Sequence, residues 1–432
     1  MKVHYHTFGC KANQYDTERM RQELEARGAE TVYDRAAADL CVVNTCTVTN
    51  QADAGARRFI RKVWRENSDI RIVVAGCSAA LRAPEYRSME EVFEVVEGHD
   101  PVAVAGAAAG GPPLAQLGTN RSLDGIDLEP VGGEILTRRE GATRGWLKIQ
   151  DGCDRQCSFC ATRLARGRSR SRDPSEVVRE ARSLARRHPE LVLTGIHIGH
   201  YGRDLTPPIT LGGLLARLLD EVPQARFRLG SIEATEVDED LLDLLVRSNG
   251  RVAPHLHMPL QSGADPVLRR MRRWHTREMY RARALEIAEK FEFLGLGADI
   301  ITGFPGETDE DHRATVELVE ELPYTYVHVF PFSPREGTVA AELQEEMPVP
   351  QRVAGERSKE LRDIVQAKGE AYRRRRAGTR ARVVLEGDGR YALTEDYLRV
   401  AATGPGAEDH RRMYGAELVM ADGELSAVLR SR

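Results

Sequence analysis

The regular alternation of short apolar segments with charged helical ones between residues 145 and 330 most constrains the fold. Amphipathic patterns such as SEVVREARSLARR (175–187) separate the apolar segments and predict helices. Parallel strands need such crossover helices, so this alternation predicts a parallel sheet. Six units are too few to close an eight-stranded barrel, and we expect a partial (β/α)6 barrel. The expected strands are GWLKIQ (145–150), LVLTG (191–195), RFRLGS (226–231), HLHMPL (255–260), GLGADIITG (295–303) and TYVHVF (325–330).

Residues 1–105 show the same alternation on a smaller scale and predict a separate parallel α/β domain. Its expected strands are KVHYHTF (2–8), ADLCVVN (38–44) and IRIVVAG (70–76), and its expected helices lie around 14–27 and 51–66. The stretch 106–140 begins with GAAAGGPP and has no clear periodicity, which is typical of a linker.

The end of the chain changes character after an arginine-rich stretch that finishes near residue 376. The segments RARVVLE, GRYALTEDYLRVA and GAELVMADGELSAVLR alternate with period two and are separated by glycine turns. This pattern predicts a small antiparallel β-barrel over 371–432. The chain is therefore expected to be a multidomain α/β protein, with its larger domain over 141–370.

The composition narrows the functional class only slightly. No apolar run approaches the roughly 18 residues of a membrane helix, and the N-terminus has no signal-peptide pattern, so we expect a cytoplasmic protein. The formal net charge of −4 does not indicate a nucleic-acid binder, but positive charge gathers in RGRSRSR (166–172), RRMRR (269–273) and RRRR (373–376). Such runs either contact phosphates or form solvated helix faces.

Three of the seven cysteines, Cys153, Cys157 and Cys160, follow the first strand of the larger domain in the pattern C-x3-C-x2-C. β/α barrels keep their chemistry at the ends of their strands, and closely spaced thiolates hold iron–sulfur clusters. A zinc site is the alternative. It would normally need a fourth ligand nearby, whereas His188 and His197 follow only some thirty residues later. The pattern therefore favours a cluster with three protein ligands.

Cys10, Cys46 and Cys77 lie at or just beyond the ends of the three expected N-terminal strands. Ligands of open α/β sheets bind outside the carboxyl ends of the strands, so these three thiols could converge. Two interpretations remain open for them: a second three-thiolate cluster, or three buried structural cysteines. Cys41 lies inside the apolar run LCVV and is expected to pack in the core.

Taken together, the motifs of this chain resemble those of the methylthiotransferases, a family of radical S-adenosylmethionine enzymes. The resemblance spans nearly the whole chain and implies an N-terminal cluster domain, a radical S-adenosylmethionine domain and a C-terminal TRAM domain. The motifs are TFGCKANQYDTE (7–18), VVNTCTVTNQADAGARR (42–58), VVAGC (73–77), CDRQCSFC (153–160), RGRSRSR (166–172), LTGIHIGHYG (193–202), RLGSIEATEV (228–237), HLHMPLQSGAD (255–265), MRRWHT (271–276), DIITGFPGET (299–308) and HVFPFSPREGT (328–338).

Within the family, the chain looks most like the branch that acts on N6-threonylcarbamoyladenosine in transfer RNA. NTCTVTNQAD and HVFPFSPREGT carry that likeness, whereas ATRLARG (161–167) departs from the more apolar, proline-bearing stretch that is usual there. The alternatives are the branches that modify N6-isopentenyladenosine or a ribosomal-protein aspartate. A non-catalytic RNA-binding module with a structural metal is a third hypothesis, from a different functional class.

The resemblance implies two 4Fe–4S clusters and S-adenosylmethionine. Cys153, Cys157 and Cys160 would hold the cluster that generates a 5′-deoxyadenosyl radical, and Cys10, Cys46 and Cys77 would hold an auxiliary cluster that presents sulfur. The family chemistry converts the C2–H of adenosine 37 into C2–SCH3. The implied partners are the anticodon stem-loop of transfer RNA and an electron donor such as flavodoxin or ferredoxin.

The resemblance also implies contacts to the cofactor and to RNA. Thr194 and Gly195 would meet the amino group of S-adenosylmethionine, and Glu233 and Gln261 its ribose or methionine part. The residues expected to line its adenine side or the cluster loop are Phe159, Ile301, Gly303 and Pro305. Candidate RNA contacts are Arg166, Arg170, Arg172, Arg373, Arg374, Arg375 and Arg376, although the first three could instead meet the cofactor carboxylate. Tyr391 or Tyr397 could stack on a base, but a place in the barrel core is the favoured role for both.

Overall fold

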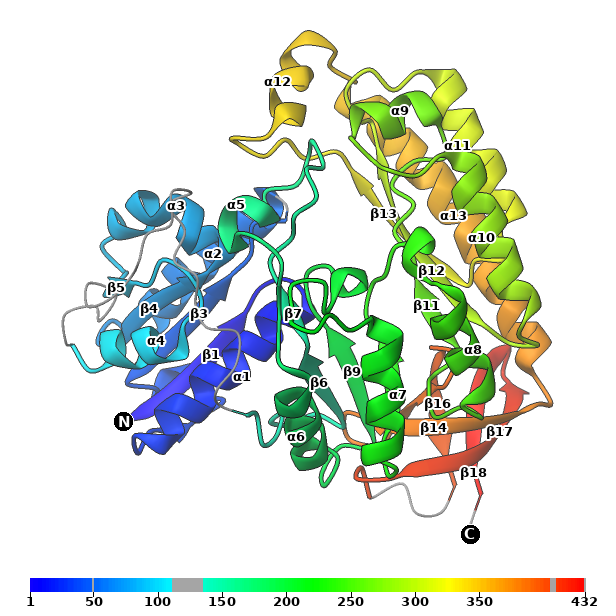
Figure 1. Ribbon diagram of the computed structural model, residues 1–432. Helices are drawn as coiled ribbons and strands as arrows, with labels where there is room; N and C mark the ends of the chain where they lie inside the picture. Colours follow the sequence, from blue (N-terminus) through cyan, green and yellow to red (C-terminus); the bar gives the residue numbers. More distant parts are fainter. Residues whose placement is uncertain (49, 111–134, 405–408, 431–432) are drawn as a thin grey trace.

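The N-terminal domain is a parallel sheet with helices on both faces, as the alternation predicts (Figure 1). The computed structural model describes residues 1–48, 50–110, 135–404 and 409–430. The strand order is β2-β1-β3-β4-β5, and all four pairings are parallel. The strands are β1 (Lys2–Thr7), β2 (Glu30–Thr31), β3 (Leu40–Thr45), β4 (Arg71–Gly76) and β5 (Glu94–Val95).

Four α-helices cover this sheet because its strands are apolar on both sides. Two of them, α1 (Lys11–Ala26) and α4 (Pro101–Ala108), pack on one face, and α2 (Asn50–Glu66) and α3 (Cys77–Arg87) pack on the other. A single turn of 3-10 helix, η1, spans Arg35–Ala37. α4 runs three residues into the stretch expected to be a linker, because its alanines bury against the sheet. The rest of that stretch up to residue 134, apart from 109 and 110, lies outside the described residues.

The central domain has the six parallel strands that the sequence predicts. They form two three-stranded sheets, β10-β9-β6 and β11-β12-β13, and an isolated parallel bridge between Ser231 and His257 links the two. The spatial order therefore follows the chain, and the partial barrel is confirmed. The strands are β6 (Arg144–Lys148), β9 (Glu190–Thr194), β10 (Arg226–Leu229), β11 (His255–His257), β12 (Gly295–Thr302) and β13 (Tyr326–Pro331).

Helices line the outside of this barrel, and short elements lie at its rim. The outer helices are α6 (Pro174–Leu184), α7 (Leu211–Glu221), α8 (Glu239–Arg247), α9 (Asp265–Arg270), α10 (Arg277–Glu289) and α11 (Asp309–Glu321). The rim carries a two-stranded antiparallel ribbon and several short helices. These are β7 (Gln150–Asp151), β8 (Arg170–Ser171), α5 (Thr162–Arg166), η3 (Ile198–His200), η4 (Ala234–Glu236) and α12 (Val339–Glu346).

The C-terminal segment forms a closed five-stranded barrel in the order β14-β15-β16-β18-β17. The small barrel is confirmed, and four of its pairings are antiparallel, whereas β16 and β18 pair in parallel. An odd ring of strands cannot alternate in direction all the way round, and at least one pair must be parallel. The strands are β14 (Arg380–Glu386), β15 (Tyr391–Thr394), β16 (Arg399–Thr403), β17 (Met413–Ala421) and β18 (Glu424–Leu429).

The long helix α13 (Gln351–Arg376) connects the central domain to this barrel. Figure 1 shows it running down the outer side of the central domain beside α10 and α11. The expected domain boundary at 370/371 falls inside this helix, which continues without interruption to Arg376. The barrel proper begins only at β14.

The small barrel covers the amino-terminal end of the central strands. Arg226 donates to the carbonyl of Arg382 at 2.7 Å, and Arg228 donates to that of Thr394 at 3.0 Å. Both guanidiniums also pair with buried Glu190, at 2.6 and 2.8 Å. Burial alone would raise the pKa of Glu190, but the charges of Arg228 and Arg226 hold it below its usual value. Because the small barrel covers this end, we expect a site at the carboxyl end of the strands.

The N-terminal domain docks against the free edge of the central sheet. α1 lies beside β6 (Figure 1), where Trp146 donates to the side-chain oxygen of Gln14 at 3.0 Å. Tyr15 donates to Glu180 on α6 at 3.1 Å. This docking brings the carboxyl ends of both sheets towards each other. Among the described residues, none of the helices is long and apolar enough to cross a membrane.

Candidate active site

Cys153, Cys157 and Cys160 lie on the loop between β7 and α5, beyond the carboxyl end of β6. Burial, together with the charges of Cys160 and Cys157, raises the pKa of Cys153 to about 12, and burial also raises the pKa of Cys157. Thiolates this close repel one another, so the three thiols resist ionising together. Metal ligands must be deprotonated, and the positive charge of a bound metal offsets the repulsion between the thiolates. The donor set therefore fits an iron–sulfur cluster.

Two polar side chains fix the shape of this loop. Gln150 accepts from the backbone N–H of His197 at 2.8 Å and donates to the carbonyl of Gly152 at 2.6 Å, so it joins the cysteine loop to the end of β9. Arg273 donates to the Cys157 sulfur at 3.6 Å and pairs with Glu233. Sequence reasoning did not single out Arg273, although it lies both in a basic run and in the motif MRRWHT (271–276).

His197 lies next to the first cysteine group although it is far away in sequence. Its Nδ1 is 3.4 Å from the sulfur of Cys153, and its Nε2 is 2.8 Å from Glu236. Burial would raise the pKa of Glu236, but the hydrogen bonds from His197 and His200 hold it below its usual value. The distance along the chain gave no sign of this contact, which arises because β9 runs beside β6. An imidazole held by a carboxylate can orient a ligating sulfur.

The second cysteine group converges as the strand ends predict. Cys46 follows β3 directly, Cys77 follows β4 directly, and Cys10 comes three residues after β1. All three line one cavity of about 230 Å³. Burial raises the pKa of Cys46 to about 11 and that of Cys77 to about 12. The charge of Cys10 contributes to both shifts, and that of Cys46 to the shift of Cys77. This donor set fits a second cluster for the same reason as the first.

One glycine permits that convergence. Gly9 has a φ of +102°, and a Cβ there would lie 2.6 Å from the sulfur of Cys46. No larger residue fits at this position without moving Cys46. Cys41, in contrast, is fully buried in the core between the sheet, α2 and α3, as predicted.

Residues of the central domain also line this cavity. Thr194 is the last residue of β9, Gly195 comes directly after it, and Ser231 comes two residues after β10. All three line the cavity with Cys10, Cys46 and Cys77. Thr194 and Gly195 were expected at the cofactor end of the barrel. The second cysteine group therefore opens onto the carboxyl end of the central strands.

Arg166 lies in a buried ion-pair network between the two domains, and the hypothesis that it contacts RNA is wrong. Its side chain is fully buried and pairs with Asp16 at 2.7 Å and Asp151 at 2.9 Å. Its Nε donates to the sulfur of Cys77 at 3.1 Å. Lys148 binds the same two carboxylates, each at 2.7 Å. No surface remains on Arg166 for a phosphate.

Two more arginines of the basic runs are buried in ion pairs, so their RNA assignments are also wrong. Arg172 pairs with Glu180 at 2.9 Å, and Arg376 pairs with Asp396 at 2.9 Å. Arg375 turns towards the central domain and donates to the carbonyl of Glu292 at 2.6 Å. Arg170 on β8 is partly exposed and stays a prediction.

The other predicted cofactor residues lie along the same rim of the barrel. Phe159 packs edge-to-face on Phe304, and both belong to a small apolar cluster that also includes Ile301. Gln261 has a φ of +68° and bridges to Ile300 of β12.

Gly303 and Pro305 follow β12 and are buried. A Cβ at Gly303 would lie 2.4 Å from that of Ala354 on α13, so helix packing accounts for this glycine. The carbonyl of Pro305 accepts from Arg270 at 3.1 Å. No contact in the described residues tests their assignment to adenine.

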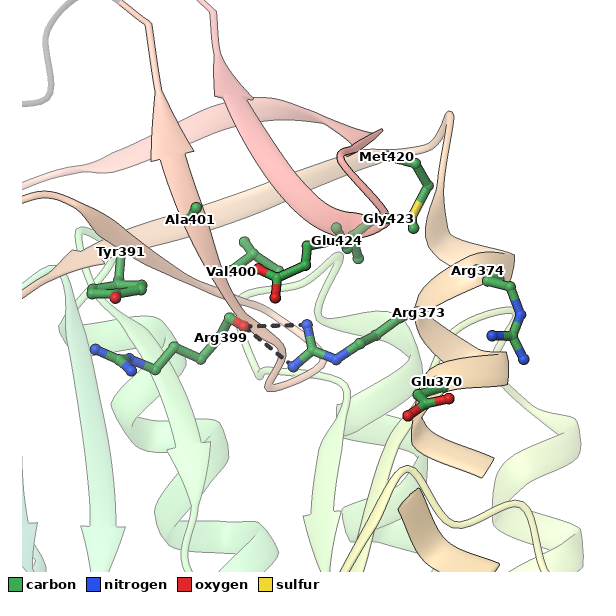
Figure 2. Close-up of a pocket in the computed structure, with 11 residues that line it drawn as sticks. Glu370, Arg373, Arg374, Tyr391, Arg399, Val400, Ala401, Met420, Gly423 and Glu424 are labelled. Carbon is green, nitrogen blue, oxygen red and sulfur yellow. Dashed lines mark hydrogen bonds between the residues drawn. The ribbon is translucent and has the colours of Figure 1, made fainter. Parts of the chain in front are cut away.

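The C-terminal barrel and the end of α13 form a groove of about 790 Å³ (Figure 2). Arg373 donates to the carbonyl of Arg399, whose guanidinium stacks 3.8 Å above the ring of Tyr391. Tyr391 is 39% exposed, so its expected place in the barrel core is wrong. Tyr397 instead packs against His255 of the central domain, with 4.2 Å between ring centroids and 31° between the ring planes. Exposed arginine beside an exposed aromatic ring is typical of nucleic-acid surfaces.

Comparison with known proteins agrees with these domains. Residues 2–98 match the family model described as Uncharacterized protein family UPF0004, and residues 147–319 match the Radical SAM superfamily. The threonylcarbamoyladenosine tRNA methylthiotransferase MtaB of Rickettsia prowazekii is 34% identical over 91% of this chain and 90% of its own length. The chain belongs to the methylthiotransferase family. The resemblance seen in the sequence is thereby confirmed.

Further methylthiotransferases place the chain within this family. MtaB of Bacillus subtilis is 38% identical over 80% of this chain and 76% of its own. A tRNA-2-methylthio-N(6)-dimethylallyladenosine synthase of Oceanobacillus iheyensis is 30% identical over 88% of this chain and 74% of its own. The chain is thus more similar to the MtaB enzymes than to that synthase.

A solved structure supports the fold alone. TsrM of Kitasatospora setae, a radical S-adenosylmethionine methyltransferase, has a TM-score of 0.57 at 17% identity, and the match covers 84% of each chain.

Membership of the radical SAM superfamily implies S-adenosylmethionine and one 4Fe–4S cluster. Cys153, Cys157 and Cys160 lie within the matched range.

Proposed function

We propose that this protein transfers a methylthio group to C2 of N6-threonylcarbamoyladenosine at position 37 of transfer RNA. One observation carries the proposal: Cys10, Cys46 and Cys77 share a cavity with Thr194 and Gly195. Sulfur chemistry and radical chemistry can therefore act on one substrate atom without movement of the nucleoside between separate sites. The similarity to MtaB enzymes supports the choice of nucleoside.

Cys153, Cys157 and Cys160 would hold one 4Fe–4S cluster, and Cys10, Cys46 and Cys77 a second. Each set provides three thiolates, which leaves one iron of a cubane open. When bound, the first cluster supplies the electron that cleaves S-adenosylmethionine, and the second supplies a site for the transferred sulfur. An electron donor such as flavodoxin or ferredoxin is a further part of the proposal.

Residues of the central domain would bind and orient S-adenosylmethionine and shield it from water. Thr194 and Gly195 would meet the amino group of S-adenosylmethionine. Glu233 and Gln261 would meet its ribose or methionine part, and Arg273 holds Glu233 in place. Apolar residues at the rim would exclude water from the adenine side. These are Phe159, Ile301, Gly303 and Pro305.

The nucleosides of a deletion strain test the proposed function. Transfer RNA from that strain is expected to lose methylthio-threonylcarbamoyladenosine and to accumulate the form without the methylthio group, as measured by mass spectrometry of digested RNA. A plasmid with the wild-type gene should restore the modification, and one with Cys10→Ala should not. Unchanged methylthio-threonylcarbamoyladenosine, or loss of the isopentenyl counterpart instead, would reject the proposal.

The groove of Figure 2 gives a prediction for RNA binding. The double substitution Arg373→Ala and Arg374→Ala should weaken transfer-RNA binding about tenfold near 0.1 M salt and lower the salt slope by about one per lost phosphate contact. Arg373 and Arg374 both line the groove, and Arg374 is exposed. The measurement is a filter-binding titration at several salt concentrations.

Arg352→Ala is the matched control for this titration. Arg352 is exposed at the other end of the same helix, about 30 Å away by helix geometry. Its substitution should leave affinity unchanged. Equal weakening by the control and the groove variant would contradict the assignment of the groove.

A further inference from the structure

Lys11 brings an uncompensated positive charge into the cavity of the second cysteine group. Two cationic side chains line this cavity, Lys11 and Arg166, and no acidic residue does. Arg166 is neutralised by Asp16 and Asp151. Lys11 is partly buried, and within the described residues no carboxylate forms an ion pair with it. A half-buried ammonium without a counter-ion is costly, which favours a negatively charged ligand.

The backbone around Lys11 adds to this field. α1 begins at Lys11 and has no acidic residue in its first turn, so the partial positive charge of the helix end is also unbalanced. Lys11, Ala12 and Asn13 all line the cavity. The ammonium and the helix end therefore act on the same space, immediately beside Cys10.

Polar side chains continue from the cavity into the barrel. Ser231 lines the cavity and lies 2.8 Å from the Nδ1 of His257. The Nε2 of His257 lies 3.3 Å from Asp299, whose strand neighbour in register is His328. Burial and the charges of His257 and Lys11 lower the pKa of His328, an effect that Asp299 opposes. A neutral imidazole there offers hydrogen bonds, and Lys11 offers the charge.

The nucleoside of the proposed function carries one anionic group on its base, at the end of the N6 arm. Its N6 arm carries a carboxylate, a hydroxyl and a urea, whereas an isopentenyl arm is apolar and uncharged. C2 and the carbon that bears N6 are separated by a single ring nitrogen. When C2 faces the sulfur of the second cysteine group, the arm extends from the same side of the base.

We propose that the ammonium of Lys11 binds the carboxylate of the threonyl arm and so selects N6-threonylcarbamoyladenosine over uncharged N6-substituted adenosines. The inference rests on the proposed function and adds the side chain that reads the substrate. Ser231 and His257 lie where they can meet the hydroxyl and urea of the arm. Binding of the modified nucleoside thereby places a carboxylate against the ammonium of Lys11, which has no such partner in the empty protein.

The test removes first the carboxylate of the RNA and then the ammonium of Lys11. Two anticodon stem-loop RNAs are compared, one with threonylcarbamoyladenosine and one in which a carboxamide replaces the threonyl carboxylate. The reconstituted wild-type protein should bind the carboxylate RNA about 10- to 100-fold more tightly, the usual effect of a charge-assisted contact. Lys11→Met should bind both RNAs as weakly as the wild type binds the carboxamide. Lys11→Arg should retain most of the preference.

Controls separate this role from others. Lys62→Met, at an exposed position of α2, should keep the full preference. Lys11→Met should keep the wild-type iron content and the wild-type dependence of 5′-deoxyadenosine formation on S-adenosylmethionine. Loss of iron would show that Lys11 serves the cluster, and a higher requirement for S-adenosylmethionine would show that it serves the cofactor; either result overturns the proposal.

Failure of the inference is distinguishable from failure of the proposed function. A wild-type protein that modifies the carboxylate RNA but binds both RNAs equally refutes the role of Lys11 and leaves the function intact. Full preference in Lys11→Met refutes it as well. A wild-type protein that leaves threonylcarbamoyladenosine unmodified and modifies isopentenyladenosine refutes the function itself, and the inference with it.

Discussion

Replacement of Cys10, Cys46 and Cys77 together by alanine is expected to abolish methylthio transfer while 5′-deoxyadenosine still forms from S-adenosylmethionine and a reductant. The two cysteine groups lie on different domains, and no residue belongs to both. Iron after anaerobic reconstitution should fall from about eight to about four atoms per chain. Iron analysis and chromatography of the nucleoside product measure the two effects.

The reciprocal variant should lose both activities. Replacement of Cys153, Cys157 and Cys160 removes the cluster that begins the radical reaction, so neither 5′-deoxyadenosine nor the methylthio product should form. Cys41→Ala is the control, because Cys41 is buried in the core away from both groups. About four iron atoms in fully reconstituted wild-type protein would contradict the two-cluster assignment.

Replacement of Arg166 by methionine is expected to destabilise the docking of the N-terminal domain by about 3–5 kcal/mol, the usual cost when one partner leaves a buried ion-pair network. Asp16 and Asp151 would then share Lys148 as their only described cationic side chain apart from the ring of His99. The sulfur of Cys77 would also lose its N–H donor. Thermal unfolding and the iron content of the second cysteine group measure both consequences.

Two further variants show whether charge is the cause. Arg163→Met changes an exposed arginine of the same helix and should leave stability within about 0.5 kcal/mol of the wild type. Adding Asp151→Asn to Arg166→Met removes one of the unpaired carboxylates and should recover part of the loss. If Arg166→Met unfolds like Arg163→Met, the network does not hold the domains together.

Much of the fold follows from local patterns. The six strands of the central domain lie within a few residues of the expected segments, because apolar runs between amphipathic helices have few alternatives. The convergence of Cys10, Cys46 and Cys77 was also predictable, since each follows a parallel strand of one sheet. The parallel pair of β16 and β18 was not, because alternation reveals which residues face inwards but not which strands become neighbours.

The basic runs show where local patterns fail. Arg166 and Arg373 look alike in sequence, yet one is buried between two carboxylates and the other lines an open groove. Asp16 is 150 residues from Arg166 along the chain, so no window of sequence contains the pair. His197 was discounted by the same kind of distance, although the pairing of β6 with β9 puts it beside Cys153.

The sequence by itself determined the cysteine groups, the domains that carry them and the family, because spacing and periodicity are local properties. Only the tertiary structure decided that Cys10, Cys46 and Cys77 share a cavity with Thr194 and Gly195 of the central domain, that Arg166 donates to Cys77, and that Lys11 lies beside them without a carboxylate partner among the described residues. Burial and charge compensation depend on residues that meet only after folding. The chemistry could thus be predicted from short motifs, whereas the selection of the substrate depends on contacts between domains.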